Sequence, residues 1–184
     1  LAIEELGYGT ISKLFLEFER PYWYEHGPWP QPGNGFIVTD LDAQTFWDSS
    51  HGQTGGGLLA NYTSGRQGAS YAPPSAYATT ADSALIQQYA ASSLAQLERV
   101  FPGISPHYTG RAALSYPTGD PFLRGSYACW RVGQYTRFAG SEGLRQGPVH
   151  FAGEHCSLDF QGFMEGAARE GARAAREIMQ DEAR

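Results

Sequence analysis

The sequence predicts a mixed α/β fold, and three observations support this prediction. Residues 8–20 carry the apolar alternation of a β-strand, and residues 82–100 repeat apolar side chains at the spacing of an amphipathic helix. The last forty residues have the pattern of a strand, a loop and a helix rich in small residues. With 184 residues, of which 41% are hydrophobic and 14% aromatic, the chain can bury an ordinary core.

The elements follow from local signals along the chain. Alternating Leu14, Leu16 and Phe18 favour a strand that ends at Pro21, and Phe101-Pro102-Gly103 stops the helix. In chain order we expect a strand at 8–20, a Pro/Gly-rich loop at 25–35, paired strands at 36–40 and 44–47, a buried strand at 58–63, a loop or the entry to a helix at 64–80, a helix at 82–100, an irregular stretch at 104–147, a strand at 149–152 and a helix at 162–180.

The composition disfavours several classes of partner. Lysine and arginine total 13 against 19 acidic residues, which gives a net charge of −6 and no basic stripe for nucleic acid or an anionic membrane. No apolar run approaches the roughly 20 residues that a membrane-spanning helix needs. Two cysteines, Cys129 and Cys156, are too few for a disulfide framework or a metal site.

One binding motif is missing. No Gly-x-Gly-x-x-Gly turn joins a strand to a helix, and Gly55-Gly56-Gly57 lies in a polar loop. The chain also shows neither an initiator methionine nor a signal peptide. We therefore expect it to be the C-terminal part of a longer polypeptide.

The strongest pattern lies near the C-terminus. Phe151-Ala152-Gly153-Glu154-His155 is followed by Gly162-Phe163-Met164-Glu165-Gly166, which opens the last helix. Free N–H groups and the dipole at a helix start favour an anionic ligand edge. This segment resembles the C-terminal signature of the flavin-containing amine oxidases, a family that includes monoamine, polyamine and L-amino-acid oxidases.

The resemblance covers most of the chain and is densest at residues 8–23, 116–131 and 148–178. It implies the C-terminal portion of a two-domain, FAD-dependent amine oxidase fold. In that fold, residues 1–115 would belong to the substrate-binding domain. Residues 116–184 would return to the FAD domain.

Lys13 is the predicted catalytic residue. A lysine in a strand usually points to solvent. Without its sequence context, Lys13 would therefore indicate only an exposed side chain. Thr10-Ile11-Ser12-Lys13, followed by alternating apolar residues and Arg20-Pro21-Tyr22-Trp23, is similar to the family strand that carries a lysine near the flavin. The resemblance implies that Lys13 holds a water against the flavin during its reaction with oxygen.

The predicted cofactor residues are Gly153, Glu154, Gly162, Phe163 and Met164. A glycine after a strand allows close backbone approach, and a carboxylate beyond it can accept hydrogen bonds from hydroxyl groups. The resemblance places Glu154 beside the ribityl–pyrophosphate part of FAD. It also directs the N–H groups of Phe163 and Met164 at the flavin N1–C2=O edge.

Three aromatic residues are substrate candidates, although aromatic side chains more often pack in a core. They are Tyr127, Phe163 and Trp130. Within the family pattern, Tyr127 and Phe163 would stand on two sides of the reacting carbon. Ser126 stands where monoamine oxidases carry a cysteine bonded to the flavin, so we expect non-covalent FAD.

The resemblance implies an FAD-dependent L-amino-acid oxidase with L-glutamate favoured, as in the bacterial L-glutamate oxidases. Those enzymes are secreted and cleaved into chains that stay together. We accordingly expect an extracellular protein, with a cytoplasmic location still open, that pairs with other segments of its precursor and forms a homo-oligomer. Arg124 and Arg131 are options for binding the substrate carboxylate. The alternatives are a monoamine or polyamine oxidase, or a non-catalytic interaction subunit.

Overall fold

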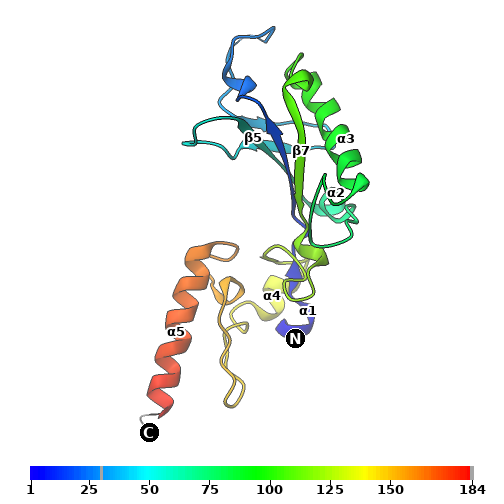
Figure 1. Ribbon diagram of the computed structural model, residues 1–184. Coiled ribbons are helices and arrows are strands. Elements are labelled where there is room, and N and C mark those ends of the chain that lie inside the picture. The colour runs from blue at the N-terminus through cyan, green and yellow to red at the C-terminus, as the bar shows by residue number, and fades with distance from the viewer. Residues whose placement is uncertain (30, 183–184) are drawn as a thin grey trace. The chain divides into compact units, whose positions relative to one another are not determined.

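The computed structural model describes residues 1–29 and 31–182, which form two compact units (Figure 1). Thr10–Arg124 form the first, called here the sheet unit. Leu1–Gly9 and the chain from Gly125 onward form the second, called the terminal unit. The mixed α/β class is confirmed. The units are interleaved in sequence, and their limits differ from the boundary predicted between residues 115 and 116.

The sheet unit is built on a six-stranded antiparallel sheet in the order β3-β4-β5-β2-β7-β6. The central strand β2 pairs with β5 on one side and β7 on the other. The strands are β2 (Ser12–Phe18), β3 (Phe36–Val38), β4 (Thr45–Asp48), β5 (Gly57–Thr63), β6 (Tyr77–Thr79) and β7 (Tyr108–Ser115).

One face of this sheet is covered by helix α3 (Ala84–Val100), which lies along β7 in Figure 1. Alternate residues of β2 are fully buried on that face, and they form one core cluster with Ile86 and Leu97 of the helix. Ser83 caps α3 by accepting a hydrogen bond from the Leu85 amide at 3.2 Å. Lys13 lies on the opposite face, which α3 does not cover.

The remaining elements of the sheet unit are short. They are η1 (Tyr22–Tyr24), α2 (Gly65–Ala69), η2 (Ser105–His107) and η3 (Pro117–Gly119).

The terminal unit is formed from both ends of the described chain. Strand β1 (Gly7–Tyr8) pairs with β8 (Ala128–Cys129), so the N-terminal residues join the C-terminal half. Helix α5 (Met164–Glu182) is the longest element, and it packs against η4 (Glu154–Cys156). The other helices of this unit are α1 (Ala2–Glu5) and α4 (Gln134–Phe138).

Several predicted elements are confirmed, and three predictions are wrong. The strand pair β3–β4, the strands β2 and β5 and the helices α3 and α5 lie where they are expected. The stretch 104–147 contains β7, and the stretch 64–80 contains α2 and β6. The strand predicted at 149–152 is only an isolated bridge between Val149 and Gln146.

Candidate functional site

Glu154 connects two segments of the terminal unit that are far apart in sequence. Its Oε1 atom accepts a hydrogen bond from the Ala128 amide at 2.7 Å, and its Oε2 atom accepts one from the Gly162 amide at 2.6 Å. Ala128 lies in β8, and Gly162 lies two residues before α5. We call this arrangement the Glu154 junction. It ties the segment after Tyr127 to the start of the long helix.

Tyr127 packs at the Glu154 junction. A β-carbon at Gly162 would lie 3.5 Å from Tyr127 Cδ2, so the ring is in contact range of this glycine. Gly162 has φ +84°, a conformation that favours glycine. The Gly9 amide donates to the Tyr127 carbonyl at 2.8 Å and fixes the backbone. The structure thus brings a predicted substrate aromatic beside two predicted cofactor residues.

The start of α5 offers hydrogen-bond donors, but not all of those expected. The Phe163 amide donates to the Phe160 carbonyl at 3.1 Å, so the prediction that it is free is wrong. Met164 begins the helix, where N–H groups have no intrahelical acceptor. The side chains of Phe163 and Met164 are 67% and 91% exposed.

Gln161 is a candidate that the sequence analysis missed. Its side-chain nitrogen Nε2 is buried and has no hydrogen-bond partner among the residues that the structure describes. An unpaired buried donor is costly, so a ligand acceptor at this place would be favourable. No pattern in the sequence indicates that the glutamine before Gly162 is buried.

The backbone conformation at position 153 restricts this position to glycine. Its φ of 143° and ψ of 169° lie outside the range of other residues, and a β-carbon would collide with the His155 ring.

Cys156 ends the short helix η4, and its Sγ donates to the Glu142 carbonyl at 3.4 Å. Burial, together with the nearby Glu170 carboxylate, raises the pKa of Cys156 to about 11, so the thiol is neutral near pH 7.

Trp130 has a packing role in the terminal unit. Its ring centroid lies 5.5 Å from that of Tyr135 and 5.4 Å from that of Phe138. Both partners belong to α4. These contacts favour the core reading of Trp130 over direct substrate contact.

Lys13 lies on the open face of the sheet unit and is half-buried. It is paired in register with Tyr62 of β5, and its Nζ lies 5.9 Å from the Tyr62 ring centroid. The Tyr62 and Trp47 rings are 4.6 Å apart. Lys13 is also the sole lysine of the sequence. The sequence alone does not predict that Tyr62 and Trp47 share this face with Lys13, because strand alternation assigns a common face only when the register between the strands is known.

Neither a metal site nor a membrane helix is found in residues 1–29 and 31–182. No group of three or more His, Cys, Asp or Glu side chains could hold a metal ion there. Within the same residues, no helix is long and apolar enough to cross a membrane.

Several known proteins have similar sequences. The putative L-amino-acid oxidase YobN of Bacillus subtilis is 31% identical over 96% of this chain and 34% of its own length. The L-amino-acid oxidase of Mus musculus is 30% identical over 95% of the chain and 25% of its own. The L-glutamate oxidase precursor of Streptomyces diastatochromogenes is 34% identical over 72% of the chain and 19% of its own. The chain therefore spans about a third or less of these relatives.

Solved structures and a family model agree on the fold. Cyclohexylamine oxidase from Brevibacterium oxydans superposes with a TM-score of 0.79 at 20% identity, over 98% of this chain and 37% of that enzyme. The model of the flavin-containing amine oxidoreductases matches residues 1–179, which include Lys13, Tyr127 and the Glu154 junction. The resemblance noted in the sequence is thus confirmed, and the chain belongs to the flavin-containing amine oxidoreductase family.

Proposed function

We propose that this chain is the C-terminal part of an FAD-dependent L-amino-acid oxidase, with L-glutamate as the favoured substrate. The reaction converts an L-amino acid, oxygen and water into a 2-oxo acid, ammonia and hydrogen peroxide. The observation that carries the proposal is the Glu154 junction, which holds an aromatic side chain at the start of a long helix in a chain of this family. Similarity to L-amino-acid oxidases over nearly the whole chain supports the substrate class.

The residues at the start of α5 fit a flavin. Gln161 Nε2, which has no partner among the described residues, and the first N–H groups of the helix are donors suited to the carbonyl edge of a planar ring. Gly153 and Gly162 present backbone without side chains. A flavin held by these residues would supply the two-electron oxidation of the C–H bond beside the substrate amine, with oxygen as the final electron acceptor.

Ser126 and Cys156 both support non-covalent binding. Ser126 has no thiol with which to form a thioether. Cys156 is buried, and its thiol is hydrogen-bonded and neutral near pH 7, which makes it a poor nucleophile. We therefore infer that denaturation releases the cofactor from the protein.

We assign the chain's own residues the following roles. Lys13 holds a polarised water during the reaction with oxygen, and Tyr127 and Phe163 flank the reacting carbon of the substrate. The amino group of the substrate reacts unprotonated, so activity falls at low pH. Arg124 and Arg131 remain the options within this chain for the substrate carboxylate.

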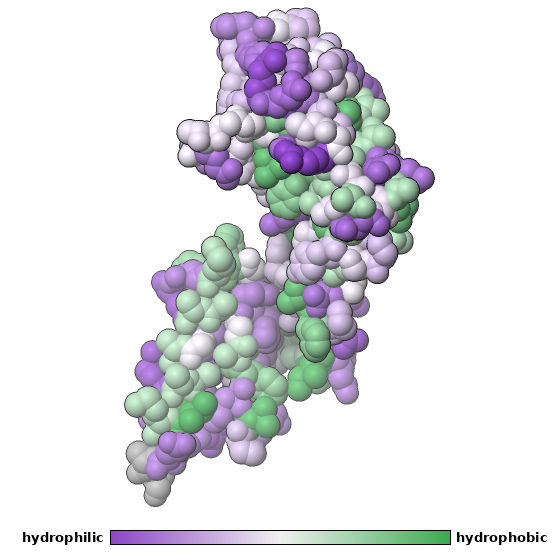
Figure 2. Space-filling view, in the orientation of Figure 1, coloured by the Kyte–Doolittle hydropathy of each residue, from purple (hydrophilic) through white to green (hydrophobic). Residues whose placement is uncertain are grey.

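Other segments of the same precursor complete the proposed enzyme, because this chain lacks a dinucleotide-binding turn. Large apolar side chains on the terminal unit are open to such a partner, among them Leu158, Phe163, Met164 and Met179. Figure 2 shows apolar colour reaching the surface along α5. Secretion and homo-oligomer formation are part of the proposal, supported by the similarity to an L-glutamate oxidase precursor.

The test uses the assembled protein that contains this chain. We expect a flavin absorption spectrum, release of FAD into the supernatant after denaturation, and peroxide formation with L-glutamate ahead of other L-amino acids. Peroxide from amines but from no amino acid would favour a monoamine or polyamine oxidase. A colourless, inactive protein would contradict the proposal and favour an interaction subunit.

A further inference from the structure

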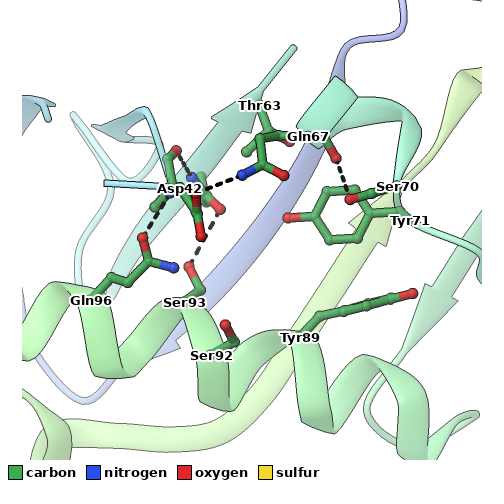
Figure 3. A pocket seen from close by; sticks show the side chains of 11 residues that line it. Asp42, Thr63, Gln67, Ser70, Tyr71, Tyr89, Ser92, Ser93 and Gln96 are labelled. Atoms are coloured by element: carbon green, nitrogen blue, oxygen red, sulfur yellow. Dashed lines mark hydrogen bonds between the residues drawn. The ribbon is translucent and has the colours of Figure 1, made fainter. Parts of the chain in front are cut away.

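The sheet unit contains a pocket of about 170 Å³ that is lined, apart from Ala43, by residues with polar side chains (Figure 3). Asn61 and Thr63 of β5 form its floor, and both side chains lie on the sheet face that α3 covers. Lys13 lies on the opposite face, so this pocket is separate from the predicted catalytic lysine. Residues of α2, α3 and the segment between them form the walls.

Part of the lining is rigid because its polar groups are already paired. The Asn61 side-chain amide donates to the carbonyls of Ala43 and Thr45 at 2.5 and 3.1 Å. Gln96 Oε1 accepts from the Ala43 amide at 2.8 Å, and Gln67 Nε2 donates to Asp42 Oδ1 at 2.8 Å. A pocket held in shape by such bonds loses little entropy when a ligand binds.

Another part of the lining has unused hydrogen-bonding capacity. The Thr63 hydroxyl is buried, the residue being 2% exposed, and makes no hydrogen bond of normal geometry within the described chain. The Tyr71 hydroxyl points into the same space in Figure 3. Burial raises the pKa of Tyr71, and its interaction with Thr63 offsets this rise only in part. Tyr71 is therefore a neutral donor and acceptor.

Two aromatic rings form one wall. The centroids of Tyr71 and Tyr89 are 4.8 Å apart, with the rings nearly perpendicular. The Ala72 amide donates to the Tyr89 hydroxyl at 3.1 Å, which fixes the second ring. Aromatic faces beside hydroxyl and amide groups suit a molecule with both C–H and O–H surface.

We propose that this pocket binds a small neutral polyhydroxy compound, between a four-carbon polyol and a monosaccharide in size. Serine, threonine and tyrosine hydroxyls can each donate and accept, as a polyol requires. The lining contains no cationic side chain that would attract an anion. The one carboxylate in the lining, that of Asp42, already accepts a hydrogen bond from Gln67. Since a 150 Å³ cavity holds benzene, this volume suits roughly six to ten non-hydrogen atoms.

The experiment titrates the assembled protein with meso-erythritol and D-ribose and follows the ligand by saturation-transfer NMR. We expect saturable binding in the millimolar range. Thr63→Val and Tyr71→Phe each remove one hydroxyl with little change of shape. Each should weaken binding by roughly three- to tenfold.

The control is Thr118→Val. Thr118 also has a buried hydroxyl without a hydrogen-bond partner in the described part of the chain, but it lies in η3 and does not line the pocket. This variant should bind the polyols as the parent protein does. Absence of saturable binding, or equal weakening by Thr63→Val and Thr118→Val, would overturn the proposal and leave a pocket filled only by water. Tighter binding of ethylammonium, lost in Asp42→Asn, would overturn it in favour of a cation site.

Discussion

Glu154 shows how one side chain can be assigned two different roles that experiment can separate. The family resemblance implies that Glu154 lies beside the ribityl–pyrophosphate of FAD, whereas in the structure both carboxylate oxygens accept hydrogen bonds from backbone amides. Glu154→Ala leaves these two amides without their acceptor. We expect it to lower the free energy of unfolding by about 1–3 kcal/mol, measured by urea denaturation.

The matched variant is Glu154→Gln, which keeps the shape and one strong acceptor oxygen. If Glu154 acts through the junction, stability and flavin retention should both decrease in the Glu154→Gln variant. Both should decrease further in Glu154→Ala. If it acts by contact with the cofactor, Glu154→Gln should lose flavin at unchanged stability, and our reading of the junction is then wrong. Glu165→Gln serves as a control, because it removes only an exposed ion pair with Arg169.

Lys13 has a kinetic prediction of its own. Lys13→Met removes the ammonium from the open face of the sheet while keeping the length of the side chain. We expect the reduced enzyme to react with oxygen about tenfold more slowly or worse, with substrate affinity nearly unchanged. Stopped-flow measurement of the two half-reactions checks this. Lys13→Arg keeps the charge and should retain more of the rate, and equal oxidation rates in all three proteins would refute the role.

At the scale of elements, α5 depends on one of its glycines and not on another. A β-carbon at Gly166 would overlap the Phe160 carbonyl and press on Ser157, so the helix could no longer approach that loop. Gly171 has nothing within 4 Å of the same position. We expect Gly166→Ala to destabilise the protein and Gly171→Ala to stabilise it by about 0.5–1 kcal/mol. Thermal unfolding of the two variants measures this, and the same sign for both would contradict the packing described.

The elements that could be predicted are those whose own residues carry a pattern typical of a helix or a strand. Helix α3 has an apolar period, a serine cap and a Pro-Gly stop, and β5 is a compact apolar run. Strand β7 was missed because Gly110, Ala112 and Ala113 are weak strand formers. It is held by pairing with β2 and β6, which are distant in sequence. The strand predicted at 149–152 shows the opposite case. Its residues favour a strand, but pairing is limited to one isolated bridge between Val149 and Gln146.

The candidate site divides in the same way. Its motif residues Gly153, Glu154 and Gly162 could be singled out from the sequence because they match the family pattern, and the two glycines have the positive φ that favours glycine. The burial of Gln161 and the contacts of Trp130 with α4 depend on tertiary packing, which single residues do not encode. Neither could be predicted from the sequence alone.

For the whole molecule, acid should reduce stability through carboxylates that are hydrogen-bonded in the fold. Hydrogen bonds from the Ser105 hydroxyl and from the amides of Gly103 and Ser105 lower the pKa of Glu98. Burial raises the pKa of Asp48, but hydrogen bonds from Ser50 and Tyr24 outweigh it and the net shift is downward. Because these groups bind protons more weakly in the folded state, their contribution is present above the unfolded pKa, near pH 4, and is lost as the pH falls further.

Glu98→Gln isolates one of these contributions. The variant should be less stable than the parent at pH 7, and the difference should shrink as the pH falls from about 5 through the lowered pKa of Glu98, because the parent protein then loses the same charge. Urea denaturation across this range measures the effect. Glu4→Gln, at an exposed position of α1, is the control for the loss of one carboxylate elsewhere in the chain. A constant difference for Glu98→Gln would show that the loop from Gly103 to Ser105 is held by packing and not by the carboxylate.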